Sequence, residues 1–431
     1  MHKNGTQAKE ETINLVQSIA EKARIASHSL ALISEKEKNK ALASLANLLK
    51  TNVKELLKAN AKDLKAAKAS GLSEAMIDRL YLTPDRIKKM EEGICQVIEL
   101  PDPAGDEIEK ITRPNRLDIR KVRVPIGVIG IIYESRPNVT IDCAALCIKS
   151  GNACILRGGK EAFNSNTALS FLTQEALRIT GITCDAVQFI PTTDRSALRM
   201  LLKLDQYIDC IIPRGGEGLI RFVAENAFMP VIKHYKGVCN IYVDKAADPQ
   251  MAETIILNAK TQRPGVCNAV ENLFIHQDVA ASVLPRITRS LVKKEVELRV
   301  DEATAQILRE MGNVPFKLAK EDDYYTEYLD RILSIKVVSA TSAAITAVNT
   351  YGSRHSDAII TKDKSTAKKF MAGVDSSTIY WNASTRFTDG FEFGLGAEIG
   401  ISTDKLHARG PMGLRELCTY KYLVYGNGQI K

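Results

Sequence analysis

The stretch Val124-Pro125-Ile126-Gly127-Val128-Ile129-Gly130-Ile131-Ile132-Tyr133 decides how the rest of the chain folds. It is the longest apolar run, and at roughly half of the ~20 residues that a membrane helix needs it predicts a buried strand. Beyond it, short apolar runs alternate with segments of helical periodicity. This alternation is typical of a parallel sheet with helices covering both faces.

The predicted elements fall into two successive α/β regions. In the first, strands are expected at 127–133, 153–156, 186–190, 210–212, 231–232 and 241–243, with helices at 164–179, 196–202 and 218–227. The second has helices at 249–260 and 277–296 and strands at 272–276 and 377–381. The chain is therefore predicted to be an α/β protein with more than one domain.

The segments outside these regions have a different pattern. Residues 7 to about 100 follow a period near 3.6 and are predicted to be helical. Charged and apolar residues alternate along 107–113 and 117–124, which predicts an exposed hairpin. A last strand, expected at 418–424, is predicted to pair with this hairpin in the same or a neighbouring subunit.

The composition is that of an ordinary globular protein. With 431 residues, 45% of them hydrophobic, the chain can bury a core without disulfides. Nine cysteines without paired spacing indicate free thiols in a reducing compartment. No secretory or membrane segment is visible, so a cytoplasmic protein is expected. Cys143 and Cys147 would share a helix face, but with no histidine near them core packing is favoured over a metal site.

The net charge of +8 does not indicate a nucleic-acid partner. The lysines are spread along helices and alternate with glutamates, as on a solvated helix face. An arginine-rich block and a basic motif with interleaved aromatic residues are both missing from the sequence. The basic bias suits a small anionic substrate and a phosphorylated cofactor.

The strongest candidate for chemistry is a single thiol in a loop. The segment Gln262-Arg263-Pro264-Gly265-Val266-Cys267-Asn268-Ala269 lies between a predicted helix and a predicted strand, where a side chain can be exposed on a rigid frame. Nearby cations or backbone N–H groups would ionise the thiol, so Cys267 is the candidate nucleophile. The alternative is that Cys267 is a small buried hydrophobic residue. Cys239 is the second candidate, but its strand-like context favours burial.

Two glycine loops follow predicted strands of the first region. Arg157-Gly158-Gly159-Lys160 combines a close backbone approach with two cations, which can hold a phosphate. Gly215 and Gly216 open a predicted helix, whose N–H groups and dipole favour an anion. Neither loop has the Gly-x-Gly-x-x-Gly spacing or a Gly-Lys-Ser/Thr loop, so a dinucleotide would bind in another way.

Several motifs, in order along nearly the whole chain, resemble the gamma-glutamyl phosphate reductase family of the aldehyde dehydrogenase superfamily. They are Val124–Gly130, Tyr133-Glu134-Ser135-Arg136-Pro137-Asn138-Val139-Thr140, the Cys267 loop, Trp381–Phe387, Gly396–Ser402 and His407–Leu414. The segment 344–357 also resembles a family signature, but the family usually has histidine at the position of Ala347 and often at that of Asn240. These two positions are left without an assigned role.

The resemblance implies an aldehyde dehydrogenase-like α/β fold. It places a Rossmann-like parallel-sheet NADP-binding domain at 1–104 and 125–244, an α/β catalytic domain at 245–414 and a small β oligomerisation arm at 105–124 and 415–431. It implies NADPH-dependent reduction of L-glutamyl 5-phosphate to L-glutamate 5-semialdehyde and phosphate, the second step of proline biosynthesis. It also implies a homo-oligomer, a dimer or tetramer, with glutamate 5-kinase as a candidate partner.

The resemblance also suggests roles for individual residues. Cys267 would form a thioester, with the Asn138 side chain and the Cys267 backbone N–H as oxyanion donors. Arg157, Lys160 and Glu398 would hold the cofactor, together with Gly158, Gly215 and Gly216. The substrate-binding candidates are Arg263, Arg386, Arg136 and His355, although each arginine could equally form a structural ion pair.

Two other classes of function stay open at this point. One is a hydrolytic or coenzyme A-acylating aldehyde dehydrogenase, but the hydrolytic enzymes use a glutamate base where this chain has His234-Tyr235-Lys236-Gly237. The other is a catalytically silent scaffold that kept the fold. Fold alone does not establish function, so the site residues must decide. The intact Cys267 loop, Asn138 and Glu398 argue against a silent scaffold.

Overall fold

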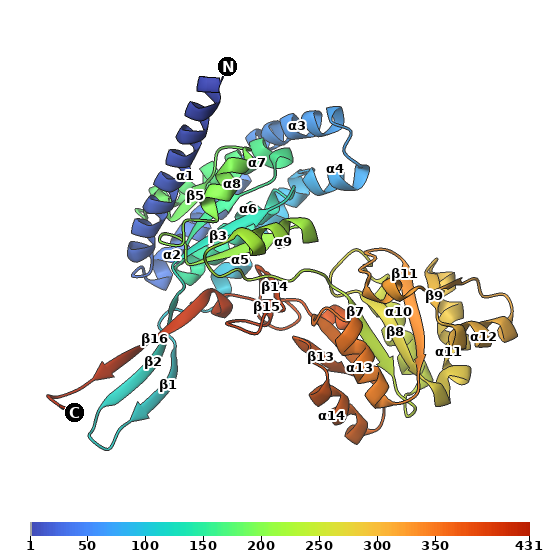
Figure 1. Cartoon of the computed structure of the whole chain (residues 1–431). Helices are drawn as coiled ribbons and strands as arrows, with labels where there is room; N and C mark the ends of the chain where they lie inside the picture. The colour runs from blue at the N-terminus through green and yellow to red at the C-terminus, as the bar shows by residue number, and fades with distance from the viewer. Residues whose placement is uncertain (1) are drawn as a thin grey trace. The chain divides into compact units, whose positions relative to one another are not determined.

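The computed structural model describes the backbone of residues 2–431 and the side chains of 10–431 apart from that of Ala75. The chain forms two compact units, shown in Figure 1. The first unit extends to Lys233 and includes Gly394–Gly400 and Met412–Lys431. The second comprises His234–Phe393 and Ile401–Pro411. We describe each unit by itself.

The first unit contains a four-stranded parallel sheet in the order β5-β4-β3-β6. Its strands are β3 (Val128–Tyr133), β4 (Ala153–Arg157), β5 (Val187–Phe189) and β6 (Cys210–Arg214). Every residue of β3 is buried, as the apolar run 124–133 predicted. The predicted strand 231–232 is present only as an isolated bridge from Val231 to Ile211. Two residues are too few to add a full strand to the sheet.

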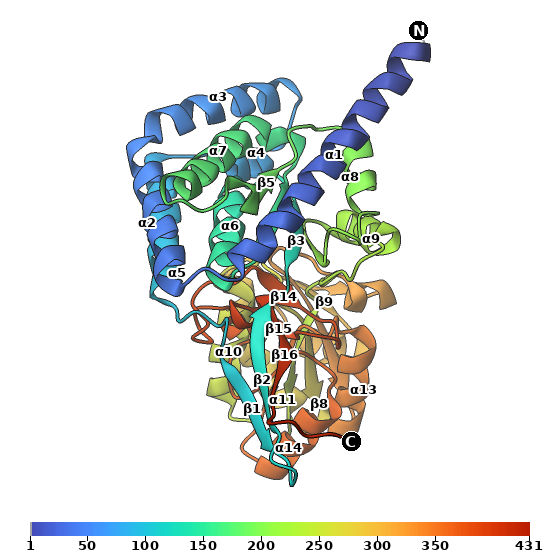
Figure 2. The ribbon, with the colours of Figure 1, turned by 90° about the vertical axis from the view of Figure 1, so that its left-hand side faces the viewer.

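Helices cover this sheet. One core joins its strands to α1 (His2–Leu30), α8 (Arg195–Leu201) and α9 (Glu217–Asn226); Figure 2 shows α1 running beside α8. The helices α6 (Asn138–Ser150) and α7 (Phe163–Ile179) also contact the strands. Packed against α6 and α7 are α2 (Glu35–Thr51), α3 (Val53–Ala69) and α5 (Pro84–Glu99), and α4 (Glu74–Leu80) packs on α3. The predicted helical character of the N-terminal region is therefore confirmed.

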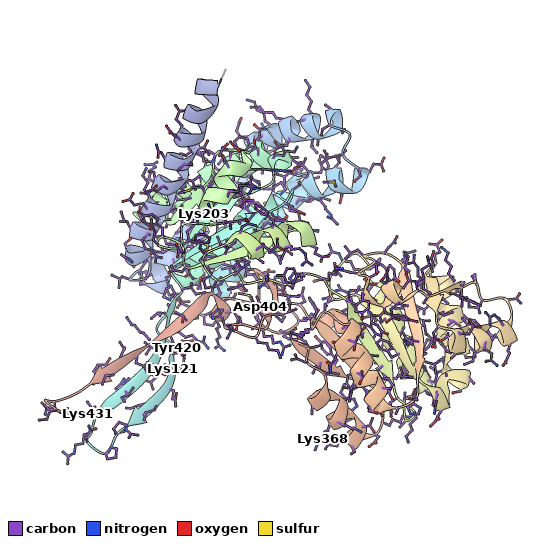
Figure 3. All side chains as sticks on the ribbon, viewed as in Figure 1. Lys121, Lys203, Lys368, Asp404, Tyr420 and Lys431 are labelled. Atoms are coloured by element: carbon purple, nitrogen blue, oxygen red, sulfur yellow. The ribbon has the colours of Figure 1, made fainter. Side chains whose placement is uncertain are left out.

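A three-stranded antiparallel arm projects from the helices of the first unit (Figure 1). It consists of β1 (Glu107–Thr112), β2 (Asp118–Pro125) and β16 (Cys418–Tyr425), with β2 in the middle. β16 pairs with β2 of the same chain, from Cys418 opposite Pro125 to Tyr425 opposite Asp118. Lys121 and Tyr420, labelled in Figure 3, face one another with the Lys121 ammonium 3.9 Å from the ring centre. Of the two predicted pairings, the structure therefore has the one within the chain.

The second unit is built on a seven-stranded parallel sheet in the order β10-β9-β11-β8-β7-β12-β13. The strands are β7 (Cys239–Val243), β8 (Val270–His276), β9 (Glu297–Val300), β10 (Lys317–Leu318), β11 (Ile332–Val338), β12 (Ser356–Ile360) and β13 (Thr378–Trp381). The sequence placed 241–243 with the first sheet, and this was wrong, because β7 pairs with β8 and β12. A strand that is buried on both faces is a continuous apolar run, and this pattern does not indicate which sheet the strand joins.

The two faces of this sheet are covered by different helices. Ile241, Leu273 and Ile275 share a core with α10 (Pro249–Thr261), α11 (Gln277–Lys293) and α12 (Glu302–Met311). The intervening residues Tyr242 and Phe274 share another core with α13 (Thr341–Tyr351) and α14 (Lys364–Gly373). Alternate residues of a strand point to opposite faces, so the sheet is a middle layer between two helical layers.

Short strands β14 (Gly400–Ser402) and β15 (Gly410–Met412) form a two-stranded ribbon, each strand running from residues of one unit into residues of the other. Among residues 2–431, no helix combines the length and apolar character needed to cross a membrane.

Both units contain a parallel sheet covered by helices, so the α/β fold class predicted from the sequence is confirmed.

Candidate active site

Cys267 lies in the loop between α10 and β8, as predicted. Its side chain is partly exposed, whereas six of the nine cysteines are buried. The ends of the loop are joined by an ion pair between Lys260 at the end of α10 and Glu271 at the start of β8, with the two charged atoms 2.6 Å apart. Both side chains are fully buried. A buried pair with this geometry fixes the distance between the loop's two ends.

The loop is also held from the side. Asn268 donates from its amide to the Thr388 carbonyl at 2.8 Å, and the Thr385 hydroxyl donates to the Asn268 carbonyl at 2.7 Å. Gly237 packs directly against the backbone of Cys267, because a Cβ at Gly237 would lie 2.1 Å from the Cys267 carbonyl oxygen. Only glycine fits this approach.

The second candidate thiol lies behind the first. Cys239 is fully buried in β7, as the sequence predicted, and burial raises the pKa of its thiol well above the ordinary value. Its Sγ donates to the Cys267 carbonyl over 3.2 Å. A buried protonated thiol is a poor nucleophile, so of the two thiols Cys267 is the one suited to attack.

His355, the fourth substrate-binding candidate, is buried. The side chain is fully buried, and burial lowers the pKa of its imidazole to about 3. Its Nδ1 is 2.8 Å from the Ser356 hydroxyl, which is itself 2.6 Å from the Thr388 hydroxyl. The structure therefore places this predicted substrate-binding residue inside the protein, and its contact with the substrate stays a prediction. His355 directly precedes β12 (Ser356–Ile360), all of whose residues are buried.

Two arginines accompany Cys267. Arg386, in the short helix Thr385–Phe387, donates from Nε to the Gln262 side chain at 2.8 Å. Burial and the neighbouring positive charge of Arg263 lower the pKa of Arg386, and the Cys267 thiol acts in the opposite direction. Arg263 itself is exposed. The fold thus brings together the candidate nucleophile and two of the arginines that are candidates for binding an anionic substrate.

In the first unit, the remaining candidates lie at the carboxyl edge of the four-stranded sheet. Arg136 and Asn138 follow β3, Arg157 ends β4 and Gly158 to Lys160 follow it, and Gly215 and Gly216 follow β6. Parallel strands direct these ends to one edge, and open α/β sheets bind ligands there. The segment containing Glu398 joins them, because a Cβ at Gly400 would lie within 2.4 Å of the Arg214 guanidinium.

The glycine loops at this edge have acidic neighbours that sequence reasoning missed. The backbone N–H of Gly216 donates to Glu134 at 3.0 Å, and a Cβ on Gly215 would meet that carboxylate at 2.7 Å. A Cβ on Gly159 would lie 2.8 Å from Glu161. A carboxylate at a helix N-terminus is electrostatically favourable, so Glu134 caps α9 in this structure. Glu134 lies in the motif Tyr133–Thr140, which resembles the family, and this was the sequence signal that could have identified it.

The cations at this edge differ in exposure. Arg157 is half-buried, and burial is the largest factor that lowers the pKa of its guanidinium. Lys160 is exposed at the start of the short helix Lys160–Ala162. Together they offer two positive charges to a phosphate. Asn138, the first residue of α6, is exposed and donates from its amide nitrogen to Asp142 at 2.8 Å.

Comparison with known proteins gives consistent matches along the chain. The model of the aldehyde dehydrogenase family matches residues 2–307. Gamma-glutamyl phosphate reductase from Opitutus terrae is 59% identical over 97% of this chain and 98% of its own length. The enzyme of the same name from Carboxydothermus hydrogenoformans is 54% identical over 96% and 99%. The crystal structure of gamma-glutamyl phosphate reductase from Thermotoga maritima is 47% identical, covers 96% of this chain and 99% of that chain, and superposes with a TM-score of 0.94.

Proposed function

The chain belongs to the gamma-glutamyl phosphate reductases of the aldehyde dehydrogenase family, and we propose that it reduces L-glutamyl 5-phosphate with NADPH through a thioester on Cys267. The reaction belongs to proline biosynthesis, where we place it second. The observation that carries the proposal is the partly exposed Cys267 beside Arg263 and Arg386, in a loop held by the Lys260–Glu271 pair.

In the first step, the Cys267 thiolate attacks the carbonyl carbon of the acyl phosphate. The carbon–oxygen bond to phosphate breaks, inorganic phosphate leaves with the bonding electrons, and a thioester remains. The thioester is then reduced by a hydride, which the reduced nicotinamide supplies when bound. The resulting thiohemiacetal releases L-glutamate 5-semialdehyde and the Cys267 thiolate.

The developing oxyanion requires fixed donors. We assign the Asn138 carboxamide and the Cys267 backbone N–H, and the loss of one such donor typically raises the barrier by about 2.7–4 kcal/mol. Arg263, Arg386 and Arg136 are assigned to the anionic groups of the substrate, since guanidinium groups bind carboxylate and phosphate with two hydrogen bonds.

The carboxyl edge of the first unit is assigned to the cofactor. Arg157 and Lys160 provide the cations for the extra phosphate of NADPH, and Glu398 is assigned to the nicotinamide ribose. Gly158, Gly215 and Gly216 allow the backbone to approach the cofactor closely. The glycine loops and the two cations fit a phosphorylated dinucleotide, although Glu134 must leave the Gly216 N–H if a phosphate is to take its place.

Water is not the expected acyl acceptor. The segment His234–Gly237 contains no carboxylate, and the His234 Nδ1 lies 2.9 Å from the Ile401 carbonyl. Without a general base, water attacks a thioester slowly, and phosphate serves as acceptor in the reverse direction.

The arm is assigned to subunit contacts in a cytoplasmic homodimer or tetramer. It exposes large apolar side chains, namely Ile108, Ile111, Tyr420, Tyr422, Val424 and Tyr425. Exposed apolar surface of this kind marks interaction sites. A glutamate 5-kinase that delivers the labile acyl phosphate is the partner that this chemistry suggests.

The decisive assay supplies glutamate 5-semialdehyde and NADP to the purified protein with and without inorganic phosphate. We expect reduction of NADP that requires phosphate and is lost in Cys267→Ala but retained in Cys184→Ala, which removes an exposed cysteine elsewhere. Activity without phosphate would indicate a hydrolytic dehydrogenase instead. Full activity of Cys267→Ala would refute the thioester.

A further inference from the structure

Asn138 and Asp142 form a pair on one face of α6. They are four residues apart, so their side chains lie one turn from each other. The Asn138 Nδ2 donates to the Asp142 Oδ2 over 2.8 Å. Asn138 is exposed at the first position of the helix, and Asp142 is half-buried beneath it.

An asparagine side chain has two ends of similar shape and opposite hydrogen-bonding character. One end is an NH₂ group with two donors, and the other is a carbonyl oxygen that only accepts. Rotation by 180° about the last side-chain bond exchanges them. An oxyanion is stabilised by the first orientation and repelled by the second.

Asp142 accepts the Asn138 hydrogen bond although its burial favours the protonated carboxyl. Burial raises the pKa of its carboxyl to about 6, while the Asn138 hydrogen bond and the positive charge of Arg214 from β6 act to lower it. The neighbouring thiol of Cys143 is buried, which raises its pKa, so it carries no charge. Neutral pH lies above the pKa of Asp142, so its ionised form, which only accepts, predominates.

We infer that Asp142 is a positioning residue, which holds the Asn138 carboxamide with its NH₂ group toward the carboxylate and one N–H left for the oxyanion of the substrate. An ionised carboxylate cannot pair with the Asn138 oxygen, so the reversed orientation is disfavoured. The inference rests on the oxyanion role proposed for Asn138. Asp142 itself need not contact the substrate.

The test is a double-mutant cycle with Asn138→Ala, Asp142→Ala and the combination, measured as kcat and as KM for NADPH. We expect Asn138→Ala to reduce kcat by about 10²–10³, the usual loss for one oxyanion donor. Asp142→Ala should reduce kcat by a smaller factor, about tenfold, with KM for NADPH unchanged. In the Asn138→Ala background the same Asp142→Ala substitution should change kcat less than about twofold, because no carboxamide is left to orient.

Two further variants separate positioning from folding. Asp142→Asn keeps the size of the side chain but lets Asn138 pair in either orientation, so kcat should fall without loss of thermal stability. Asp209→Asn is the matched control. This aspartate accepts from the Val128 N–H at 2.7 Å at the opposite, amino-terminal edge of the same sheet and pairs with Arg24 at 2.9 Å. Loss of its charge should lower stability but not kcat.

The outcomes are distinguishable. Wild-type kcat in Asp142→Ala, or an equal loss with and without Asn138, would overturn the positioning role and leave the proposed function intact. Wild-type kcat in Asn138→Ala would instead remove Asn138 from the proposed mechanism, and the inference with it.

Discussion

At the scale of single residues, the position of the candidate nucleophile Cys267 depends on a residue without a side chain, Gly237. Gly237 lets two backbones meet, and its neighbour across that contact is the carbonyl of Cys267. The loop that carries Cys267 is therefore held by close backbone packing as well as by hydrogen bonds. Substitution at this glycine tests how accurately Cys267 must be placed.

We predict that Gly237→Ala inactivates the enzyme more than it unfolds it. The added methyl group overlaps the Cys267 carbonyl, so the backbone must shift, at a cost of about 1–3 kcal/mol. Thermal unfolding and kcat would be measured together. Gly93→Ala is the control, because Gly93 lies inside α5 with nothing within 4 Å of a new Cβ, and it should raise stability. An active Gly237→Ala enzyme would show that the contact is not needed.

Asn240 also obtains a role at this scale. The sequence left it unassigned, because it departs from a histidine that the family often has. In the structure its backbone N–H and side-chain amide both donate to Asp357, at 2.8 and 2.6 Å, and its oxygen accepts from Asn272 at 2.9 Å. Asn240 thus links β12, β7 and β8, three neighbouring strands of the seven-stranded sheet.

A pH-dependent effect follows from Asp357. Burial raises the pKa of this carboxyl to about 6, against the hydrogen bonds from Ser376 and Asn240 that lower it. Because the folded pKa lies above the unfolded one, the folded state binds the proton more tightly. Stability is therefore greatest at low pH and falls as pH rises from about 4 to 6. Since one pKa unit corresponds to about 1.4 kcal/mol, the free energy of unfolding should fall by up to about 3 kcal/mol over this range.

The comparison between wild type and Asp357→Asn isolates this effect. Chemical denaturation of both proteins between pH 4 and 7 would be measured. Relative to the variant, the wild type should lose stability as pH rises. A difference that does not change with pH would show that Asp357 has an ordinary pKa.

At the scale of elements, the Lys260–Glu271 pair joins a helix end to a strand start around the Cys267 loop. Removing one partner leaves a buried charge without compensation, and we expect Glu271→Leu or Lys260→Met alone to lower the free energy of unfolding by about 3–5 kcal/mol. The double apolar variant should be closer to wild type in stability, since the desolvation penalty disappears as well.

Measuring kcat separates the effect of the ion pair on stability from its effect on the geometry of the Cys267 loop. If the pair sets the loop's geometry, the double variant should be stable but have a reduced kcat. Equal stability of the single and double variants would contradict the account of an uncompensated buried charge. The exposed ion pair Lys88–Glu92 in α5 is a suitable control, and its loss should have little effect.

At the scale of the whole molecule, the arm leaves apolar side chains in solvent. If the arm forms the proposed subunit contact, Ile111→Lys combined with Tyr422→Lys should prevent assembly of subunits, because charged groups would be buried in that contact. Light scattering or sedimentation would give the mass. The control, Lys110→Ala, removes an exposed charge from the same strand. An unchanged oligomer would assign the contact to another surface.

The sequence by itself determined the local elements and the identity of the candidate site. Period-2 and period-3.6 patterns depend on neighbouring residues, so β3, α10 and the arm strands were predicted to within a few residues. The glycine, cysteine and arginine motifs are also contiguous in sequence, so they could be recognised without coordinates.

Only the tertiary structure decided what depends on contacts between distant residues. It placed β7 in the second sheet, buried His355, paired Gly237 with Cys267 and set Glu134 on the N-terminus of α9. Burial and cross-strand partners are properties of the packed chain, and a residue's own neighbours in sequence do not encode them. The same histidine or carboxylate can therefore be a ligand group or a buried support, and packing alone separates the two.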